Sequence, residues 1–169
     1  MSNKSYVAII LAVGLILSIG CIVLVFAIEE PISAANVSFG AASNETELIS
    51  FVESAVAHAK EVGKDNAIKD FMDLNGPWVK GDVYIFAHDF NGTALSLPYM
   101  PKEVGTNRSD IKNDQGAYIN REMRSIALNG GGFYEYNYRN PISNQTEPKL
   151  GYVMKVDDTW WLGAGIYKT

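Results

Sequence analysis

Three aromatic-rich stretches near the C-terminal end constrain the fold of this chain most. They occupy residues 130–140, 148–153 and 160–167, and turn-forming residues separate them. Aromatic side chains alternate there with small or polar ones, which is the period-2 pattern of half-buried strands. Strands that follow one another through short turns favour antiparallel pairing. The sequence therefore predicts that these three strands form an antiparallel meander.

The residues before this meander predict helices and two further strands. Apolar residues recur at helical spacing as Leu48, Phe51, Val52, Ala55, Val56, Ala59 and Val62. The remaining elements are expected as a short helix at 65–74, strands at 82–89 and 93–97, a polar loop at 98–114 and a helix at 117–128. Asn91-Gly92 is a strong hairpin signal between the two strands. This order predicts an α+β fold with helices packed on a five-stranded antiparallel sheet.

Residues 6–28 contain no charged side chain and are rich in Ile, Leu, Val and Ala. A helix of that length rises about 34 Å, enough to cross a hydrocarbon core of about 30 Å. Lys4 precedes this run and the next basic residue is Lys60, so we expect residues 1–5 in the cytoplasm. We therefore expect a transmembrane helix at 6–28, a linker at 29–43 and an extracytoplasmic domain at 44–169. Whether the N-terminal helix is instead cleaved, as a signal peptide would be, stays open.

Charge and glycosylation motifs agree with an extracytoplasmic location. The chain has a formal net charge of −5, and an acidic domain disfavours nucleic acid as a partner. Cys21 is the only cysteine, so an intrachain disulfide is excluded. Beyond the expected membrane segment, N-x-S/T triplets begin at Asn36, Asn44, Asn91, Asn107 and Asn144. We expect a glycoprotein surface, although the sequence leaves open which triplets are used.

No catalytic or metal-binding constellation stands out. The two histidines are His58, inside the first helix, and His88, next to Asp89. Neighbouring residues on a strand point to opposite faces, so His88 and Asp89 cannot easily cooperate. Asp110 and Asp114 lack the spacing of a calcium loop and are interpreted as cap and turn residues. The sequence therefore predicts neither an enzyme nor a metal or cofactor site.

Tyrosines on the expected strands predict a pocket for a small ligand. Tyr84, Phe86 and His88 share one face of the first strand, and Tyr134, Tyr136 and Tyr138 share one face of the third. A phenol offers an apolar ring and a polar tip, and a lysine such as Lys149 can neutralise a carboxylate. The alternative is that the tyrosines only build the sheet and that Lys149 is a solvated lysine in a turn.

Several short motifs resemble single Cache domains of the second type, which are PAS-like extracytoplasmic sensors. The resemblance covers residues 48–167 and rests on Tyr84-Ile85-Phe86, Asp89-Phe90-Asn91-Gly92-Thr93, Gly105-Thr106-Asn107-Arg108, Asp114-Gln115-Gly116, Gly131-Gly132-Phe133, Asn140-Pro141, Pro148-Lys149 with Tyr152, and the run 160–167. It implies a PAS-like five-stranded sheet behind a long N-terminal helix. It also implies a ligand site, often for short carboxylic acids, formed by Tyr84, Tyr136, Lys149 and Tyr152, with Leu97 and Pro98 as the loop-side wall.

The resemblance and the expected membrane helix together predict a membrane-anchored sensor. We expect it to bind a short carboxylate and to signal through a receptor or transporter partner. The alternative is a cell-surface module that binds a solute without signalling, or that has only a structural role. The sequence alone identifies neither the ligand nor the oligomeric state.

Overall fold

The computed structural model describes residues 45–168 of the chain. The membrane helix expected at 6–28, the linker at 29–43 and the expected helix cap Asn44 lie outside the described residues. Within the described part, every helix is too short or too polar to span a membrane. The elements are α1 (Glu45–Val62), α2 (Lys64–Phe71), β1 (Val79–Lys80), β2 (Val83–Tyr84), β3 (Phe86–Asp89), β4 (Ala94–Ser96), the 3-10 helix η2 (Pro101–Glu103), α3 (Ile119–Leu128), β5 (Gly131–Arg139), β6 (Thr146–Lys155) and β7 (Trp160–Tyr167).

Five strands form one antiparallel sheet in the order β4-β3-β7-β6-β5. The predicted meander is confirmed, because β5 pairs with β6 and β6 pairs with β7. The register places Lys149 opposite Tyr136 on one side and opposite Tyr167 on the other. β7 then pairs with β3, so the last strand lies in the middle of the sheet. The α+β prediction, with a long N-terminal helix and a five-stranded sheet, is confirmed.

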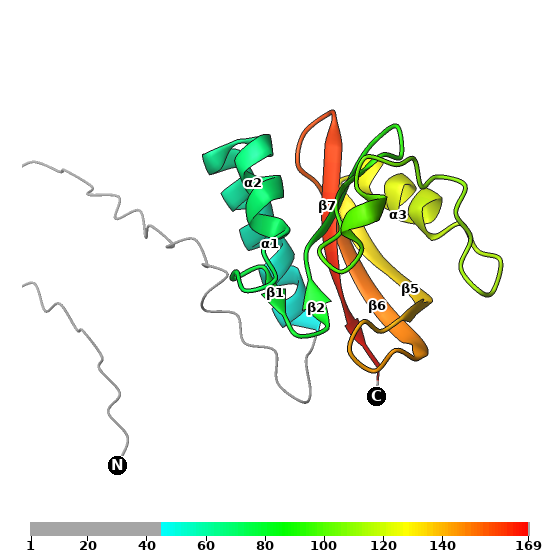
Figure 1. The fold of residues 1–169 in the computed structure, drawn as a ribbon. Coiled ribbons are helices and arrows are strands. Elements are labelled where there is room, and N and C mark those ends of the chain that lie inside the picture. Colours follow the sequence, from blue (N-terminus) through cyan, green and yellow to red (C-terminus); the bar gives the residue numbers. More distant parts are fainter. Residues whose placement is uncertain (1–44, 169) are drawn as a thin grey trace, which may run out of the picture.

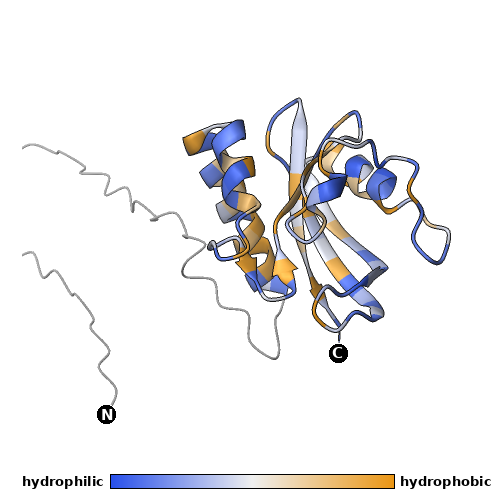
Figure 2. Cartoon of the chain, in the orientation of Figure 1, coloured by the Kyte–Doolittle hydropathy of each residue, from blue (hydrophilic) through white to orange (hydrophobic). Residues whose placement is uncertain are grey.

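The two faces of the sheet carry different helices (Figure 1). α1 and α2 lie on one face and α3 lies on the other. α1 packs on β6 and β7, whereas α3 packs on β5 and β6. The apolar segments of α1 gather toward the sheet, and the long loop beside α3 is largely polar (Figure 2). One face is therefore a closed apolar core, and the other combines apolar contacts with a polar loop.

Side chains of the central strand β7 alternate between these faces. One set belongs to the apolar core under α1: Trp160, Leu162, Ala164 and Ile166. Trp161 belongs to the cluster on the α3 face. This alternation follows from the period of two along a strand. Burial on both faces explains why the β7 sequence is almost uninterruptedly apolar.

The first predicted strand, at 82–89, is split in the structure. β2 pairs with β1 in a two-stranded hairpin outside the main sheet, and β3 alone joins β4 and β7. Gly81 turns this hairpin with a φ of 64°, a conformation that favours glycine. Between β2 and β3, the Ile85 amide donates to the Trp78 carbonyl at 3.1 Å. The two-residue strand β1 was not predicted, because so short a segment has no readable period.

Gly163 provides a test of how closely the sheet is packed. A Cβ at this position would lie 2.6 Å from the carbonyl oxygen of Tyr152 and 2.7 Å from a methyl of Val153. We expect Gly163→Ala to destabilise the protein by about 1–3 kcal/mol, as overpacking of a buried site does. Thermal unfolding of the full chain in a mild detergent measures the effect. Gly132→Ala is the control, since its Cβ would meet only an Ile126 methyl at 3.0 Å. Equal losses in both variants would contradict the prediction.

Candidate ligand-binding site

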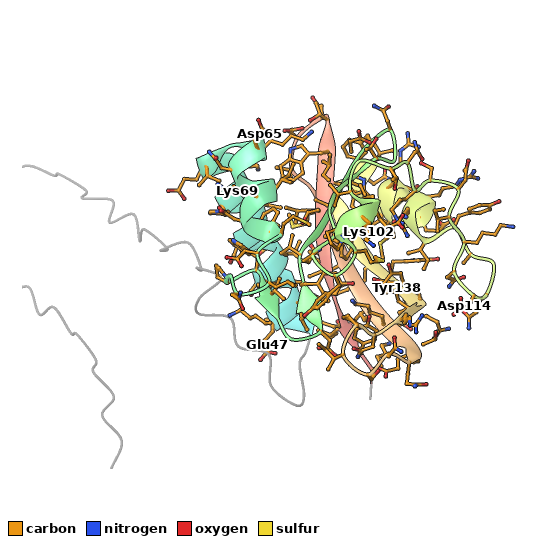
Figure 3. All side chains as sticks on the ribbon, viewed as in Figure 1. Glu47, Asp65, Lys69, Lys102, Asp114 and Tyr138 are labelled. Carbon is orange, nitrogen blue, oxygen red and sulfur yellow. The ribbon has the colours of Figure 1, made fainter. Side chains whose placement is uncertain are left out.

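A cavity of about 570 Å³ opens on the α3 side of the sheet. Strands β2, β3 and β5 line its base, residues 108–114 of the long loop line one wall, and α3 lines another. Tyr138 of β5 and Asp114 of the loop both lie on this side of the sheet (Figure 3). The volume falls within the range of small-molecule pockets, about 300–1,000 Å³.

Three of the sequence-predicted residues line this cavity: Tyr84, Tyr136 and Leu97. Together with Tyr138, the two tyrosines form what we call the tyrosine floor (Tyr84, Tyr136 and Tyr138). Burial raises the pKa of Tyr84 and Tyr136 well above the usual value, so their hydroxyl groups stay neutral. Pro98 is buried next to Leu97 but does not line the cavity.

Tyr152 is on the other face of the sheet. It packs against the apolar core under α1, and its ring centroid lies 4.8 Å from that of Phe133. Tyr152 is three residues from Lys149, and an odd separation along a regular strand puts two side chains on opposite faces. Tyr152 therefore does not lie with the other predicted ligand residues, because β6 directs its side chain to the opposite face of the sheet.

Lys149 lies behind the tyrosine floor and is buried, with 1% of its surface exposed. Its Nζ is 4.5 Å from the ring centroid of Tyr84, 4.3 Å from that of Tyr167 and 5.8 Å from that of Tyr138. The side chain passes over Gly165, where a Cβ would come within 2.7 Å of the lysine Cε. The alternative interpretation of a solvated turn lysine is thus excluded by its burial.

The ammonium group of Lys149 is poorly compensated. Within residues 45–168 it makes no hydrogen bond or ion pair, and its neighbours are the faces of aromatic rings. Burial lowers the pKa of Lys149 to about 7, although the negative charge of Asp82 acts in the opposite direction. Cation–π contacts offset only part of the desolvation of a buried charge. Below a pH of about 7, the site therefore holds a positive group that has no paired anion among residues 45–168.

Further cations line the cavity itself. The charged lining residues are Arg108, Lys112, Arg139 and Asp114, so positive groups outnumber negative ones. Arg108 donates through Nη1 to Glu103 at 2.7 Å, and its side chain is 13% exposed. The cavity is thus positive in a chain whose formal net charge is −5. Sequence reasoning did not single out Arg108 as a ligand residue, because nothing local shows that the loop folds it over the sheet.

His88 lines the cavity and is 2% exposed. Its ring stacks on Trp161, with centroids 5.1 Å apart and an interplanar angle of 18°. Neither ring nitrogen has a hydrogen-bond partner among the described residues. Burial, aided by the positive charge of Arg108, lowers the pKa of His88 to about 4. The neighbouring Asp89 instead accepts the amides of Asn91 and Thr93 in the hairpin turn.

The acidic residues of the long loop have local partners. Asp110 pairs with Arg121, and Asp114 accepts a hydrogen bond from Thr146 at 3.1 Å. The sequence predicts that Asp114 forms a turn here. In the structure Asn113 forms it, because its side-chain oxygen accepts hydrogen bonds from the amides of Gln115 and Ala117. These contacts tie the loop to α3 and to β6 on either side of the cavity.

Replacing Lys149 tests whether its charge opposes folding. Because its pKa is about 7 in the fold and 10.5 ordinarily, the folded state binds fewer protons than the unfolded state between these values. The free energy of unfolding should therefore rise with pH from about 7 to 9. Below pH 7 the cost of burying the charged lysine should be fully present. We expect Lys149→Met to raise Tm at pH 6 and to remove the increase of stability between pH 7 and 9.

Thermal unfolding of the full chain at several pH values measures both effects. Lys155→Met, on the same strand but partly exposed and paired with Asp158, should leave Tm and its pH dependence nearly unchanged. A lower Tm for Lys149→Met at pH 6 would contradict the prediction.

Comparisons with known proteins agree with this fold. The sensor histidine kinase MctS of Rhizobium johnstonii is 30% identical over 87 residues, which are 51% of this chain and 19% of that kinase. A methyl-accepting chemotaxis protein of Vibrio parahaemolyticus has a similar structure, with a TM-score of 0.64 and 25% identity over 72% of this chain and 86% of the other.

Two further solved structures share the fold. The periplasmic sensor domain of a chemotaxis protein matches 73% of this chain and 94% of its own, with a TM-score of 0.62 and 24% identity. A Cache chemosensory domain studied for carboxylic acid recognition matches 73% of this chain and 86% of its own, with a TM-score of 0.56 and 23% identity. The sequence family described as the Cache domain (dCache_2) matches residues 45–169. The chain therefore belongs to the Cache domain family of sensors.

Proposed function

We propose that this Cache domain binds a small organic anion, most simply a short carboxylate, in the cavity on the α3 face. The observation that carries the proposal is Lys149, a buried ammonium group directly behind the tyrosine floor that forms no ion pair within the described part of the chain. A carboxylate that reached the tyrosine floor would bring a negative charge close to this ammonium group in a desolvated environment. Coulomb attraction is strong there because little water screens it.

The cavity supports the same choice of ligand. Arg108, Lys112 and Arg139 line it against a single acidic residue, Asp114. A concave site lined by one sign of charge attracts ligands of the opposite sign and raises their local concentration. The hydroxyl groups of the tyrosine floor can in addition donate hydrogen bonds to carboxylate oxygens. Lys149 then supplies long-range attraction, while the lining residues supply the direct contacts.

We further propose that binding is read out as a conformational change and that the domain performs no catalysis itself. The loop at 98–114 forms the movable wall in this proposal, because its residues 108–114 line the cavity. Backbone hydrogen bonds hold the middle of the loop to the β3–β4 hairpin, from Gly105 and Thr106 to Ala94 and from Arg108 to Gly92. Tyr99 donates to the Gly81 carbonyl at 2.6 Å, and the Tyr138 hydroxyl contacts the Met100 sulfur at 3.8 Å. A ligand that binds the closed loop better than the open loop shifts the population toward closure.

Anchoring by the apolar segment 6–28 would place this domain outside the cytoplasm, with a membrane partner that relays the signal. The similarity to chemotaxis and histidine kinase sensors supports a signalling role. The Cache domain with carboxylic acid recognition supports the ligand class by analogy of fold. Under this proposal α1 transmits the change, since it packs along β6, the strand that carries Lys149.

A thermal-shift screen of the full chain in mild detergent tests ligand binding. We expect short carboxylates at a hundred times their Kd to stabilise the protein by about 2.7 kcal/mol, which is several degrees in Tm. The matching amines and neutral amides should give no shift. Lys149→Met should greatly reduce the carboxylate shift, whereas Lys155→Met should retain it. A screen in which amines or amides bind and carboxylates do not would sink the proposal.

Binding should also depend on pH. A bound carboxylate favours the charged form of Lys149, so affinity should be constant below pH 7 and fall as the lysine loses its proton above it. The limiting loss is about tenfold per pH unit. Burial raises the pKa of Tyr84, Tyr138 and Tyr167, and that of His88 is about 4, so these groups do not titrate in this range.

Isothermal titration calorimetry at pH 6, 7, 8 and 9 measures this dependence. The Lys149→Met variant serves as the reference for any residual binding. Affinity that stays flat from pH 6 to 9 in the unaltered chain would mean that Lys149 does not interact with the ligand.

A further inference from the structure

His88 is a second buried polar group that faces the cavity without a partner. Both of its ring nitrogens are buried, and no described residue accepts or donates a hydrogen bond to them. A buried polar group left unpaired is unfavourable, because it has lost its hydrogen bonds to water without gaining others. Stacking on Trp161 fixes the ring plane, so the imidazole is held in place before any ligand arrives. Such a group is adapted to meet a polar atom of a bound molecule.

Arg108 lies close enough to His88 to lower its pKa through charge repulsion. The guanidinium carries five N–H donors, and its contact with Glu103 uses Nη1 only. The imidazole is neutral at physiological pH because its pKa is about 4, and it therefore offers one N–H donor. Arg108 and His88 together present donors and positive charge, which excludes an ammonium group and favours an anionic acceptor.

We propose that His88 and Arg108 form a second anion-binding subsite, so that the natural ligand carries two acidic groups, as a short dicarboxylate does. One carboxylate lies at the tyrosine floor near Lys149, and the other lies between His88 and Arg108. This inference rests on the proposed function, because it assigns the other end of the same ligand.

The geometry of the base strand limits the length of that ligand. Tyr84 marks the Lys149 end, and His88 lies four residues further along the chain, with Phe86 between them. Because the chain leaves one sheet after β2 and enters another at β3, these four residues span at most about 13 Å. Hydrogen bonds of about 3 Å at each end leave at most about 7 Å for the ligand. A dicarboxylate such as succinate or glutarate fits within that length, and the apolar ring of Phe86 faces its methylene groups.

Matched ligand pairs test the second subsite directly. Succinate is compared with butyrate and glutarate with pentanoate, so that each pair differs in one carboxylate. Titration calorimetry uses the full chain in mild detergent at a pH of about 6.5, where the carboxylates are ionised. We expect each dicarboxylate to bind at least about tenfold more tightly than its partner, since charge-assisted hydrogen bonds have that strength.

Two variants test whether the tighter binding of the dicarboxylates comes from His88 and Arg108. His88→Phe keeps a ring on Trp161 but removes both nitrogens, and Arg108→Gln removes the charge. Each should remove most of the dicarboxylate advantage, so that the affinity for dicarboxylates falls much more than the affinity for butyrate and pentanoate. Lys149→Met should weaken the binding of both the dicarboxylates and the monocarboxylates. Circular dichroism establishes that the variants are folded, and the comparison of ligands in the unaltered chain does not depend on them.

The outcomes separate this inference from the proposed function. Equal affinity for both members of each pair, with binding still lost in Lys149→Met, would overturn the second subsite and leave the carboxylate site standing. A dicarboxylate advantage that survives in both His88→Phe and Arg108→Gln would also overturn it. Absence of binding by either class would overturn both proposals.

Discussion

The strict alternation of side chains along β7 is the constraint on which the rest of the structure depends. This strand lies in the middle of the sheet and has a tryptophan on each face, Trp160 under α1 and Trp161 on the α3 side. A shift of register by one residue would exchange the two faces and place each ring in the packing made for the other. Large residues toward α1 close that face into a core. Gly163 and Gly165, which alternate with them, leave the other face free for Phe86 and for the stem of Lys149.

Lys149 illustrates how a buried, uncompensated charge opposes folding. The surrounding rings of Tyr84, Tyr138 and Tyr167 exclude water but supply no negative charge. Under the proposed function, this destabilising group is what gives the domain a strong response to an anion. Binding sites are often less stable than the same positions filled with apolar residues. The large apolar core under α1 supplies the stability that tolerates this group.

Much of the architecture could be predicted from sequence because it depends on local periodicity. The α1 stripe, the Asn91-Gly92 hairpin and the final meander carry clear patterns, and each appears in the structure. The opposite orientation of Tyr152 was also readable, since it follows from counting positions along β6. Burial of Lys149 and the approach of Arg108 to His88 were not readable. Both depend on how distant segments fold over the sheet, and no short motif encodes that arrangement.

The Lys149 side chain also contacts a strand, β2, that has no backbone pairing with β6. It lies on β6, while the rings around its ammonium group come from β2, β5 and β7. β2 pairs only with β1 and has no backbone ladder to β5 or β6. The ammonium group thus adds a side-chain contact between the small β1–β2 hairpin and the main sheet to the covalent link through Ile85. We expect a change in the charge or position of this ammonium group to act on the hairpin, through Tyr84, and on the C-terminal end of β7, through Tyr167. The effect would not have to pass through the backbone hydrogen bonds of the sheet.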